Sequence, residues 1–441
     1  MKKKLWFVII PLLLAIIILV MYLASRSLIE DPQKMIFASI WNDNYDIKNA
    51  SLRVQKARAG FIKGVEETGD GLQLVEIQIS EGSDVGKFTT LIAETYNNTD
   101  ILMTVGGTTD EATMYASTYM NFFNIPILIP FADGNLTSAN VETDYSIRMT
   151  PVSQNYVDFI DKIYSKNIFD YINTYLFENK AVPKISADVA VFFADNFNGH
   201  ESTVKITQKI MDNGFNVEAY VPFEKDMLLP RVQSAWSKSP EAMSSLKSVL
   251  IVGEDLDELP SLVDVWHLWA DRGLYPIFVL IGYAPNQMEA ELASASNVFV
   301  IQQALDMYNC PSEIVNRSEA MGYAAGTILT NALKKASNNM MSNNRSFLSG
   351  VSKLFMNEDQ RKSAHQDYLK TYRLNVRTAL LDMDEDIPCY GYVNFNSDVG
   401  NRIELELVHY SDVDQYTRVD TSVIFNRVVN DIREEYGVTD R

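Results

Sequence analysis

The sequence has few of the residues from which metal and redox sites are built. Its 441 residues include two cysteines, Cys310 and Cys389, and four scattered histidines. No CxxC pair, HExxH motif or GxSxG motif occurs. These absences argue against a bound metal, a cofactor or catalytic residues, and we expect none of the three. The two cysteines could form one disulfide outside the cytoplasm or stay free thiols, and the sequence leaves both open.

Glycine-rich phosphate-binding loops are also missing. The segment from Gly82 to Phe88 imitates a P-loop, but its spacing is one residue short and Phe88 stands where Ser or Thr is required. The segment Val105–Thr109 lacks the GxGxxG spacing of dinucleotide-binding turns. Nucleotide-binding enzymes are therefore not indicated.

Basic charge is scarce outside the N-terminus. The chain has 38 Lys and Arg against 57 Asp and Glu, a formal net charge of −19. Four of the basic residues and no acid lie in the first 28 residues, which leaves 34 basic and 57 acidic side chains, or −23, for the rest. Such an acidic domain repels phosphate backbones, so we expect no nucleic-acid partner. Most of these acids are expected simply to solvate the surface.

The N-terminus contains one long apolar run. Lys2, Lys3 and Lys4 precede nineteen uncharged residues, Leu5–Leu23, which end near Arg26. At a rise of about 1.5 Å per residue, this run just spans a hydrocarbon core of roughly 30 Å. The exit sequence from Met21 to Arg26 is a poor cleavage site, although a cleaved signal peptide remains the alternative. We expect residues 1–27 to form an uncleaved single-pass membrane anchor, with a cytoplasmic N-terminus and the bulk of the chain extracytoplasmic.

After the anchor, strand-like and helix-like segments alternate in two arrays. Such alternation predicts an α/β fold with two doubly wound parallel sheets. The inserted segment Asn167–Ser186 separates the arrays. The predicted strands of the first array are Met35–Ile40, Leu72–Ile79, Ile101–Val105, Ile127–Ile129 and Ser146–Met149. Those of the second are Asp188–Phe193, Val217–Val221, Ser248–Val252, Ile277–Ile281 and Val298–Ile301.

Several segments resemble type I periplasmic binding proteins, especially the branched-chain amino-acid-binding branch. The matching segments follow the family's order and are Ile101–Thr137, Asp144–Pro151, Asp195–Gly199, Gly322–Ala336 and Gly391–Arg402. The chain departs from the family by lacking the Gly-rich insert after the first helix. It also carries the inserted segment and an extra C-terminal helix, Ser422–Tyr436.

The resemblance implies two lobes joined by a three-strand hinge. Lobe one would take residues 34–150 and 306–385, and lobe two residues 151–305 and 386–410. Residues 411–441 would be a C-terminal helical extension. A small-molecule ligand would bind in the cleft between the lobes, at the carboxyl ends of the strands.

The resemblance also implies ligand-binding residues on lobe one. In amino-acid-binding relatives, the turn matching Gly106–Ala112 and the loop matching Phe131–Gly134 hold the ligand carboxylate. These segments point to Thr109, Asp110, Ala132 and Asp133. Asp110 falls where many relatives have a serine, and Asp133 where they have a threonine. As alternatives, Thr109 or Asp110 could cap a helix, and Asp133 could form an Asx turn.

On lobe two the resemblance points to Asn198, Glu254 and Tyr283. Glu254 follows a predicted strand and could reach the cleft, or it could be a first-turn acid favoured by the helix dipole. Trp41 ends the first strand and could stack on a ligand or pack in the core.

Together these features predict a solute-binding protein that passes an amino acid or similar solute to a membrane permease of the ABC type. The alternative is a tethered sensor that reports ligand occupancy to a signalling partner. An extracytoplasmic enzyme has no motif to support it.

Overall fold

The computed structural model describes most of the chain after the apolar run. The described residues are 34–41, 48–81, 85–107, 110–131, 145–151, 153–165, 188–195, 197–224, 227–253, 262–281, 291–292, 295–343, 356–395, 403–412 and 415–435. Among them, no helix combines the length and the apolar character needed to cross a bilayer. The expected anchor, residues 1–27, lies outside the described residues and stays a prediction, and the inserted segment also lies outside them.

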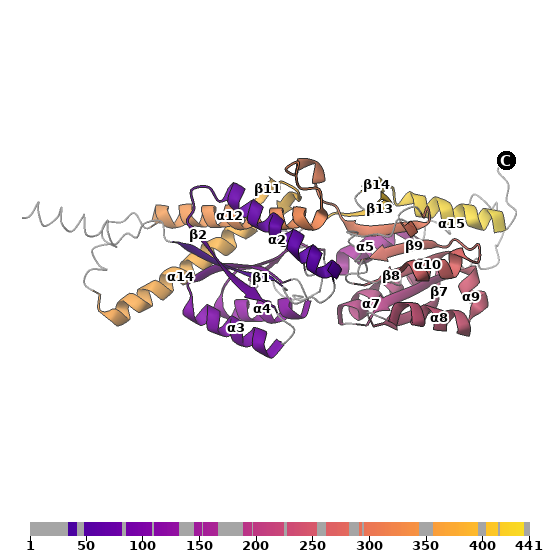
Figure 1. Ribbon diagram of the computed structural model, residues 1–441, viewed down its shortest axis with the longest axis horizontal. Coiled ribbons are helices and arrows are strands. Elements are labelled where there is room, and N and C mark those ends of the chain that lie inside the picture. The colour runs from indigo at the N-terminus through magenta and orange to yellow at the C-terminus, as the bar shows by residue number, and fades with distance from the viewer. Residues whose placement is uncertain are drawn as a thin grey trace, which may run out of the picture.

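Lobe one is built on a five-stranded parallel sheet (Figure 1). Its order is β2-β1-β3-β4-β5. The strands are β1 (Met35–Trp41), β2 (Leu74–Ser80), β3 (Ile101–Gly106), β4 (Ile127–Ile129) and β5 (Ser146–Arg148). Strand β3 is buried along its whole length, as expected for a parallel strand covered on both faces.

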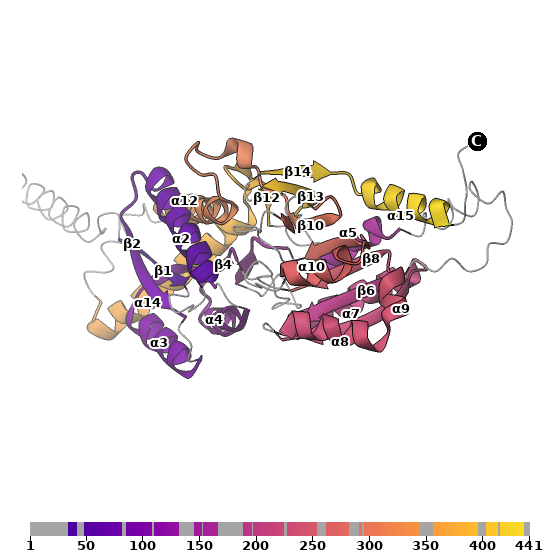
Figure 2. The ribbon, with the colours of Figure 1, turned by 45° about the vertical axis from the view of Figure 1, so that its right-hand side comes forward.

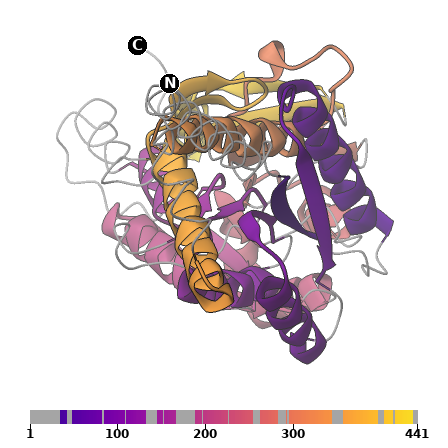
Figure 3. The ribbon, with the colours of Figure 1, turned by 90° about the vertical axis from the view of Figure 1, so that its left-hand side faces the viewer.

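Helices cover both faces of this sheet and surround its strands in the end-on view of Figure 3. Successive side chains of a strand point to opposite faces. Accordingly, Phe37 and Trp41 of β1 share a core with α2 (Lys48–Thr68), α12 (Arg317–Asn343) and α14 (Glu358–Leu381). Ala38 and Ile40 share the opposite core with α3 (Val85–Asn98) and α4 (Asp110–Phe123).

Lobe two repeats this arrangement on a seven-stranded sheet. Its parallel part has the order β7-β6-β8-β9-β10, which matches the order in lobe one, and β13 and β14 extend it in antiparallel fashion. The strands are β6 (Asp188–Ala194), β7 (Asn216–Phe223), β8 (Ser248–Val252), β9 (Ile277–Ile281), β10 (Val298–Gln303), β13 (Leu405–Asp412) and β14 (Gln415–Val419). The predicted α/β fold with two parallel sheets is confirmed.

Two helical layers also cover the sheet of lobe two. On one face lie α5 (Ser153–Ile163), α7 (Phe197–Asp212) and α15 (Ser422–Glu435). On the other lie α8 (Leu228–Lys238), α9 (Pro240–Ser245) and α10 (Leu262–Ala270). These layers bury both faces of β8 and β9, and every residue of the two strands is buried.

The chain passes between the lobes three times (Figure 2). It leaves lobe one after β5 and returns after β10 through the short helix η4 (Met307–Asn309) into α12. It then forms a hairpin of β11 (Asp384–Ile387) and β12 (Gly391–Asn394) before it enters β13.

Two predicted boundaries differ from the structure. Residues from 386 onward were assigned to lobe two, yet Ile387, Tyr390 and Val393 pack in the lobe-one core, because β11 and β12 pair with each other. The segment after 410 was expected to be helical only. It begins instead by completing β13 and adding β14, because the free edge of β13 offers a partner for a short hairpin. The helix α15 then follows as predicted.

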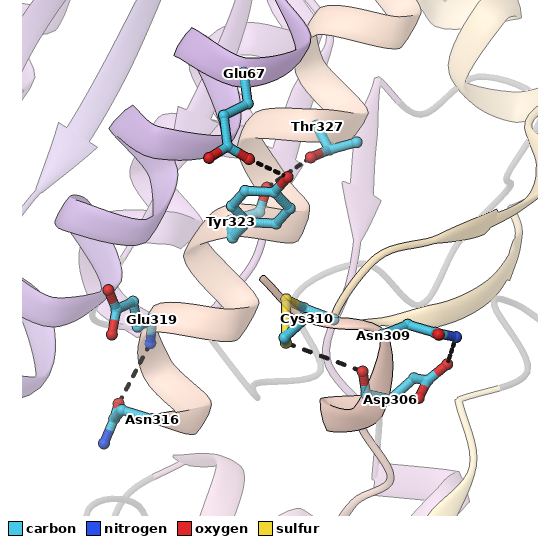
Figure 4. Close-up of a disulfide and its surroundings, with 9 residues drawn as sticks. Glu67, Asp306, Asn309, Cys310, Asn316, Glu319, Tyr323 and Thr327 are labelled. Atoms are coloured by element: carbon cyan, nitrogen blue, oxygen red, sulfur yellow. Dashed lines mark hydrogen bonds between the residues drawn. A yellow bond between two sulfur atoms is a disulfide. The ribbon is translucent and has the colours of Figure 1, made fainter. Parts of the chain in front are cut away.

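The two cysteines form a disulfide (Figure 4). Cys310 follows η4, and Cys389 lies in the turn between β11 and β12, with a Cα–Cα distance of 4.5 Å. The bridge therefore joins the second crossing segment to the hairpin that precedes the third crossing. Next to it, Asn316 caps α12 by accepting hydrogen bonds from the backbone nitrogens of Ser318, at 2.9 Å, and Glu319, at 3.3 Å.

Candidate ligand-binding site at the carboxyl ends of the strands

The strand order of each lobe reverses at one point. In lobe one the reversal lies between β1 and β3, and in lobe two between β6 and β8. Open α/β sheets bind ligands outside the carboxyl ends of the strands at such a reversal. The residues at these four ends are Trp41, Gly106, Asp195 and Gly253. They define the candidate site.

The carboxyl ends of the two sheets meet at the hinge. The Met149 carbonyl, which follows β5, accepts a hydrogen bond from Gln303 Nε2 at 3.1 Å, and Gln303 ends β10. The same carbonyl accepts a second hydrogen bond from the Tyr390 hydroxyl at 2.6 Å. One carbonyl of the first crossing segment thus contacts both the end of β10, where the second crossing begins, and the hairpin that precedes the third crossing. Because all parallel strands of a sheet end at the same edge, the carboxyl edges of both sheets border the hinge.

The turn after β3 approaches its neighbours so closely that it requires glycine. Gly106 and Gly107 have φ values of +133° and +93°. A Cβ on Gly106 would lie 2.2 Å from the Ile40 carbonyl oxygen, and one on Gly107 would lie 2.1 Å from Thr113 Oγ1. The glycines bring the backbone against both β1 and α4. The N-terminus of α4 therefore lies at the reversal, and the N-terminal end of a helix favours an anionic or hydroxyl-bearing group.

Trp41 packs in the core of lobe one. Its side chain is fully buried, and its ring centroid lies 5.6 Å from that of Phe61 and 5.8 Å from that of Phe131. No acceptor among the described residues lies within hydrogen-bonding distance of its indole Nε1. The structure thus shows the packing role that the sequence left open, and the predicted stacking on a ligand stays a prediction.

The structure describes the other predicted site residues only in part. Asp110 is the first residue of α4, and Asn198 is the second residue of α7, so both lie at helix N-termini next to the strand reversals. The remaining predictions lie outside the described residues: Thr109, Ala132, Asp133, Glu254 and Tyr283. Along the chain, Thr109 precedes α4 directly and Glu254 follows the end of β8 by two residues.

A buried ionic network at the hinge was missed by the sequence analysis. Glu406 of β13 is buried, and its carboxylate accepts hydrogen bonds from Gln302 Nε2 at 2.8 Å and from Arg418 Nε at 2.7 Å. Arg317, the first residue of α12, places its Nη1 3.6 Å from Glu406 Oε1. Arg317 also donates to the Tyr416 hydroxyl at 3.1 Å and to the Gln303 carbonyl. The first turn of a lobe-one helix is thereby held on the lobe-two sheet.

A tyrosine completes the network. Burial raises the pKa of the Tyr410 hydroxyl well above its usual range, so the group stays protonated and donates to Gln302 Oε1 at 2.6 Å.

The sequence signal for this network was Glu406 itself, because its carboxylate lies inside a strand that continues with the apolar residues Leu407 and Val408 and with Tyr410. A charge on the inner face of a strand needs a partner, but the sequence does not identify which one.

Known proteins share the fold of this chain. No protein-family model and no curated protein matches the sequence. Solved structures do match: the leucine-binding protein LivK of Thermotoga maritima aligns at 11% identity and a TM-score of 0.60, over 88% of this chain and 98% of that one. The substrate-binding protein LivJ of Streptococcus pneumoniae, in complex with isoleucine, aligns at 12% identity and a TM-score of 0.56, over 88% and 99%.

The chain has the type I periplasmic-binding fold. The predicted resemblance is confirmed at the level of the fold. A fatty acid ABC transporter substrate-binding protein of Thermomonospora curvata also aligns, at 11% identity and a TM-score of 0.57, over 89% of this chain and 94% of that one. Proteins named for solutes as different as leucine and a fatty acid thus share this fold, so the fold does not specify the ligand.

Proposed function

We propose that the chain is an extracytoplasmic solute-binding protein, tethered by residues 1–27, that binds a small polar solute between its lobes for an ABC-type importer. The observation that carries the proposal is the pair of strand reversals, one per lobe, whose carboxyl edges border a hinge of three crossing segments. Closure of the lobes around a ligand needs this arrangement and no bond chemistry. The type I periplasmic-binding fold of the aligned transport proteins supports the same function.

The proposal predicts that ligand binding closes the molecule. Mass spectrometry of small molecules that co-purify with the full chain would name the first candidate, and leucine and isoleucine are the obvious additional probes. Small-angle scattering should then show a smaller radius of gyration at saturation than without ligand. A compound that gives no heat in calorimetry serves as the control and should leave the radius unchanged. A saturating ligand that also leaves it unchanged would contradict the proposed closure.

The acids near the lobe-one reversal predict the charge of the ligand. Two unit charges about 4 Å apart repel by roughly 1 kcal/mol in water and by more at reduced dielectric. If Asp110, Asp133 and Glu254 all face the cleft, a plain carboxylate would be repelled from lobe one. We propose that the ligand directs a positive group there, such as an amine or a basic side chain. The alternative is that both acids cap local backbone and an aliphatic amino acid binds as in the relatives.

Substitution separates these two possibilities. Asp110→Ser and Asp133→Thr restore the residue types of the relatives and should each weaken a cationic ligand about ten- to hundredfold, since a charge-assisted hydrogen bond is worth about 1.5–3 kcal/mol. Asp212→Asn, at the last residue of α7 and the opposite edge of its sheet, is the matched control and should leave affinity unchanged. Calorimetry that shows equal or tighter binding in both site variants would reject a cationic ligand.

A further inference from the structure

The disulfide fixes a surface feature beside the hinge, which we call the disulfide knob. It consists of the loop 306–315, which contains η4, and of the hairpin 384–394, joined by the Cys310–Cys389 bridge (Figures 1 and 4). Buried side chains anchor the knob in the lobe-one core. They are Ile314 of the loop and Ile387 and Val393 of the hairpin. The knob is therefore a rigid part of the surface.

This rigid feature presents large apolar side chains to solvent. Tyr308 is 101% exposed, Val315 69% and Tyr392 60%. Single exposed apolar residues are ordinary, but three on one cross-linked feature are unusual. Tyrosine is enriched among the residues that dominate the energy of protein interfaces. A loop that is already fixed by a disulfide loses less conformational entropy on binding than a flexible loop does. The knob is therefore suited to binding a partner.

The knob is also strongly acidic. Its two segments contain five carboxylates and no Lys or Arg. The carboxylates belong to Asp306, Glu313, Asp384, Glu385 and Asp386. Four of these residues, all except Asp306, are exposed. Lys63 of α2 pairs with Glu313 at the border. On the hairpin, the Tyr392 hydroxyl donates a hydrogen bond to Asp384, so an acid and an exposed tyrosine are direct neighbours there.

The charge decides which partner fits. A second copy of a chain with a net charge of −19 would be repelled, and so would an anionic lipid surface. We propose that the disulfide knob is a docking surface for a protein partner that presents a Lys- or Arg-rich segment, with Tyr308 and Tyr392 as the apolar contacts. Complementary charge speeds and orients such an encounter, while the tyrosines supply buried area. The proposal does not depend on what the lobes bind.

Photo-cross-linking of the full chain in its own membranes tests the proposal. Benzoylphenylalanine replaces Tyr308, and the matched control carries it at Phe122, which is 80% exposed at the end of α4 and away from the knob. We expect position 308 to cross-link a polypeptide at least about tenfold more efficiently than position 122. Peptide sequencing by mass spectrometry should place the cross-link within or beside a Lys- or Arg-rich segment.

Charge removal is the second arm of the experiment. The cross-link at 308 should fall about tenfold in the triple variant Asp384→Asn, Glu385→Gln, Asp386→Asn, and also in about 0.5 M NaCl, where the Debye length is only roughly 4 Å. Unchanged thermal unfolding and solute binding of the triple variant would show that the fold and the interlobe site are intact. Equal yields at both positions, a salt-insensitive cross-link, a cross-link to lipid or none at all would each overturn the proposal.

Discussion

Replacing Gly322 with alanine should destabilise lobe one by about 3 kcal/mol or more, because α2 and α12 pack backbone against backbone at this residue. A Cβ on Gly322 would lie 1.8 Å from the Ala57 carbonyl oxygen and 3.0 Å from the Phe61 nitrogen. Neither atom belongs to a flexible side chain, so one of the helices would have to move. Urea unfolding of the variant measures the loss.

Three other glycines surround this contact. A Cβ on Gly60 would lie 2.0 Å from the Glu319 carbonyl oxygen, one on Gly64 would lie 2.3 Å from that of Tyr323, and one on Gly326 would lie 2.5 Å from that of Phe61. The two helices therefore approach along their whole crossing. The matched control is Asn338→Ala, an exposed position of α12, which should be neutral or slightly stabilising. If Gly322→Ala unfolded at the same urea concentration as this control, the close helix packing would be wrong.

This packing explains one of the sequence matches. The segment Gly322–Ala336 contributed to the resemblance, and in the structure its two glycines contact α2 rather than the strand reversals. The match therefore carried information about the fold and none about the ligand. In contrast, Gly106 and Gly107 in the match Ile101–Thr137 shape the candidate site itself.

The strands were predicted well for a physical reason. Parallel strands buried on both faces appear as continuous apolar runs, and β4, β8 and β9 have the predicted bounds. Helix α14 was missed because only four of its positions are buried, which leaves little periodicity to detect. The signal that remained was its capping box, in which Asn357 and Gln360 bond reciprocally.

The sequence predicted the helix N-termini beside the strand reversals, whereas the ligand-binding role of the residues there stays a prediction. The order of strands and helices places Asp110 and Asn198 at helix N-termini beside the strand reversals. A ligand contact, however, depends on side-chain direction in the loops, which periodicity does not encode. The hinge network depends on a pairing between distant segments, so Glu406 gave a hint of a buried partner without identifying Arg317.

Replacing Glu406 with glutamine should cost about 3 kcal/mol of stability, because it removes the charge that compensates a largely buried arginine. The Glu406 side chain is 4% exposed and that of Arg317 is 18% exposed, so water screens their interaction poorly. Arg418 is 63% exposed and can be solvated after the change, which keeps the loss at the low end for a buried ion pair.

The position of the network predicts how this loss appears. Arg317 begins a lobe-one helix, whereas Glu406 and its other partners, Gln302 and Arg418, lie on strands β10, β13 and β14 of lobe two. Weakening this link should reduce the cooperativity between the lobes as well as the total stability. Scanning calorimetry of Glu406→Gln should therefore show a lowered melting temperature and a transition that broadens or splits.

Glu404→Gln is the matched control, because it makes the same chemical change at an exposed residue just before β13. It should change the free energy of unfolding by less than about 0.5 kcal/mol. If the two variants melted alike, the Arg317–Glu406 contact would not couple the lobes, and the hinge would be held by the hydrogen bonds to the Met149 carbonyl instead.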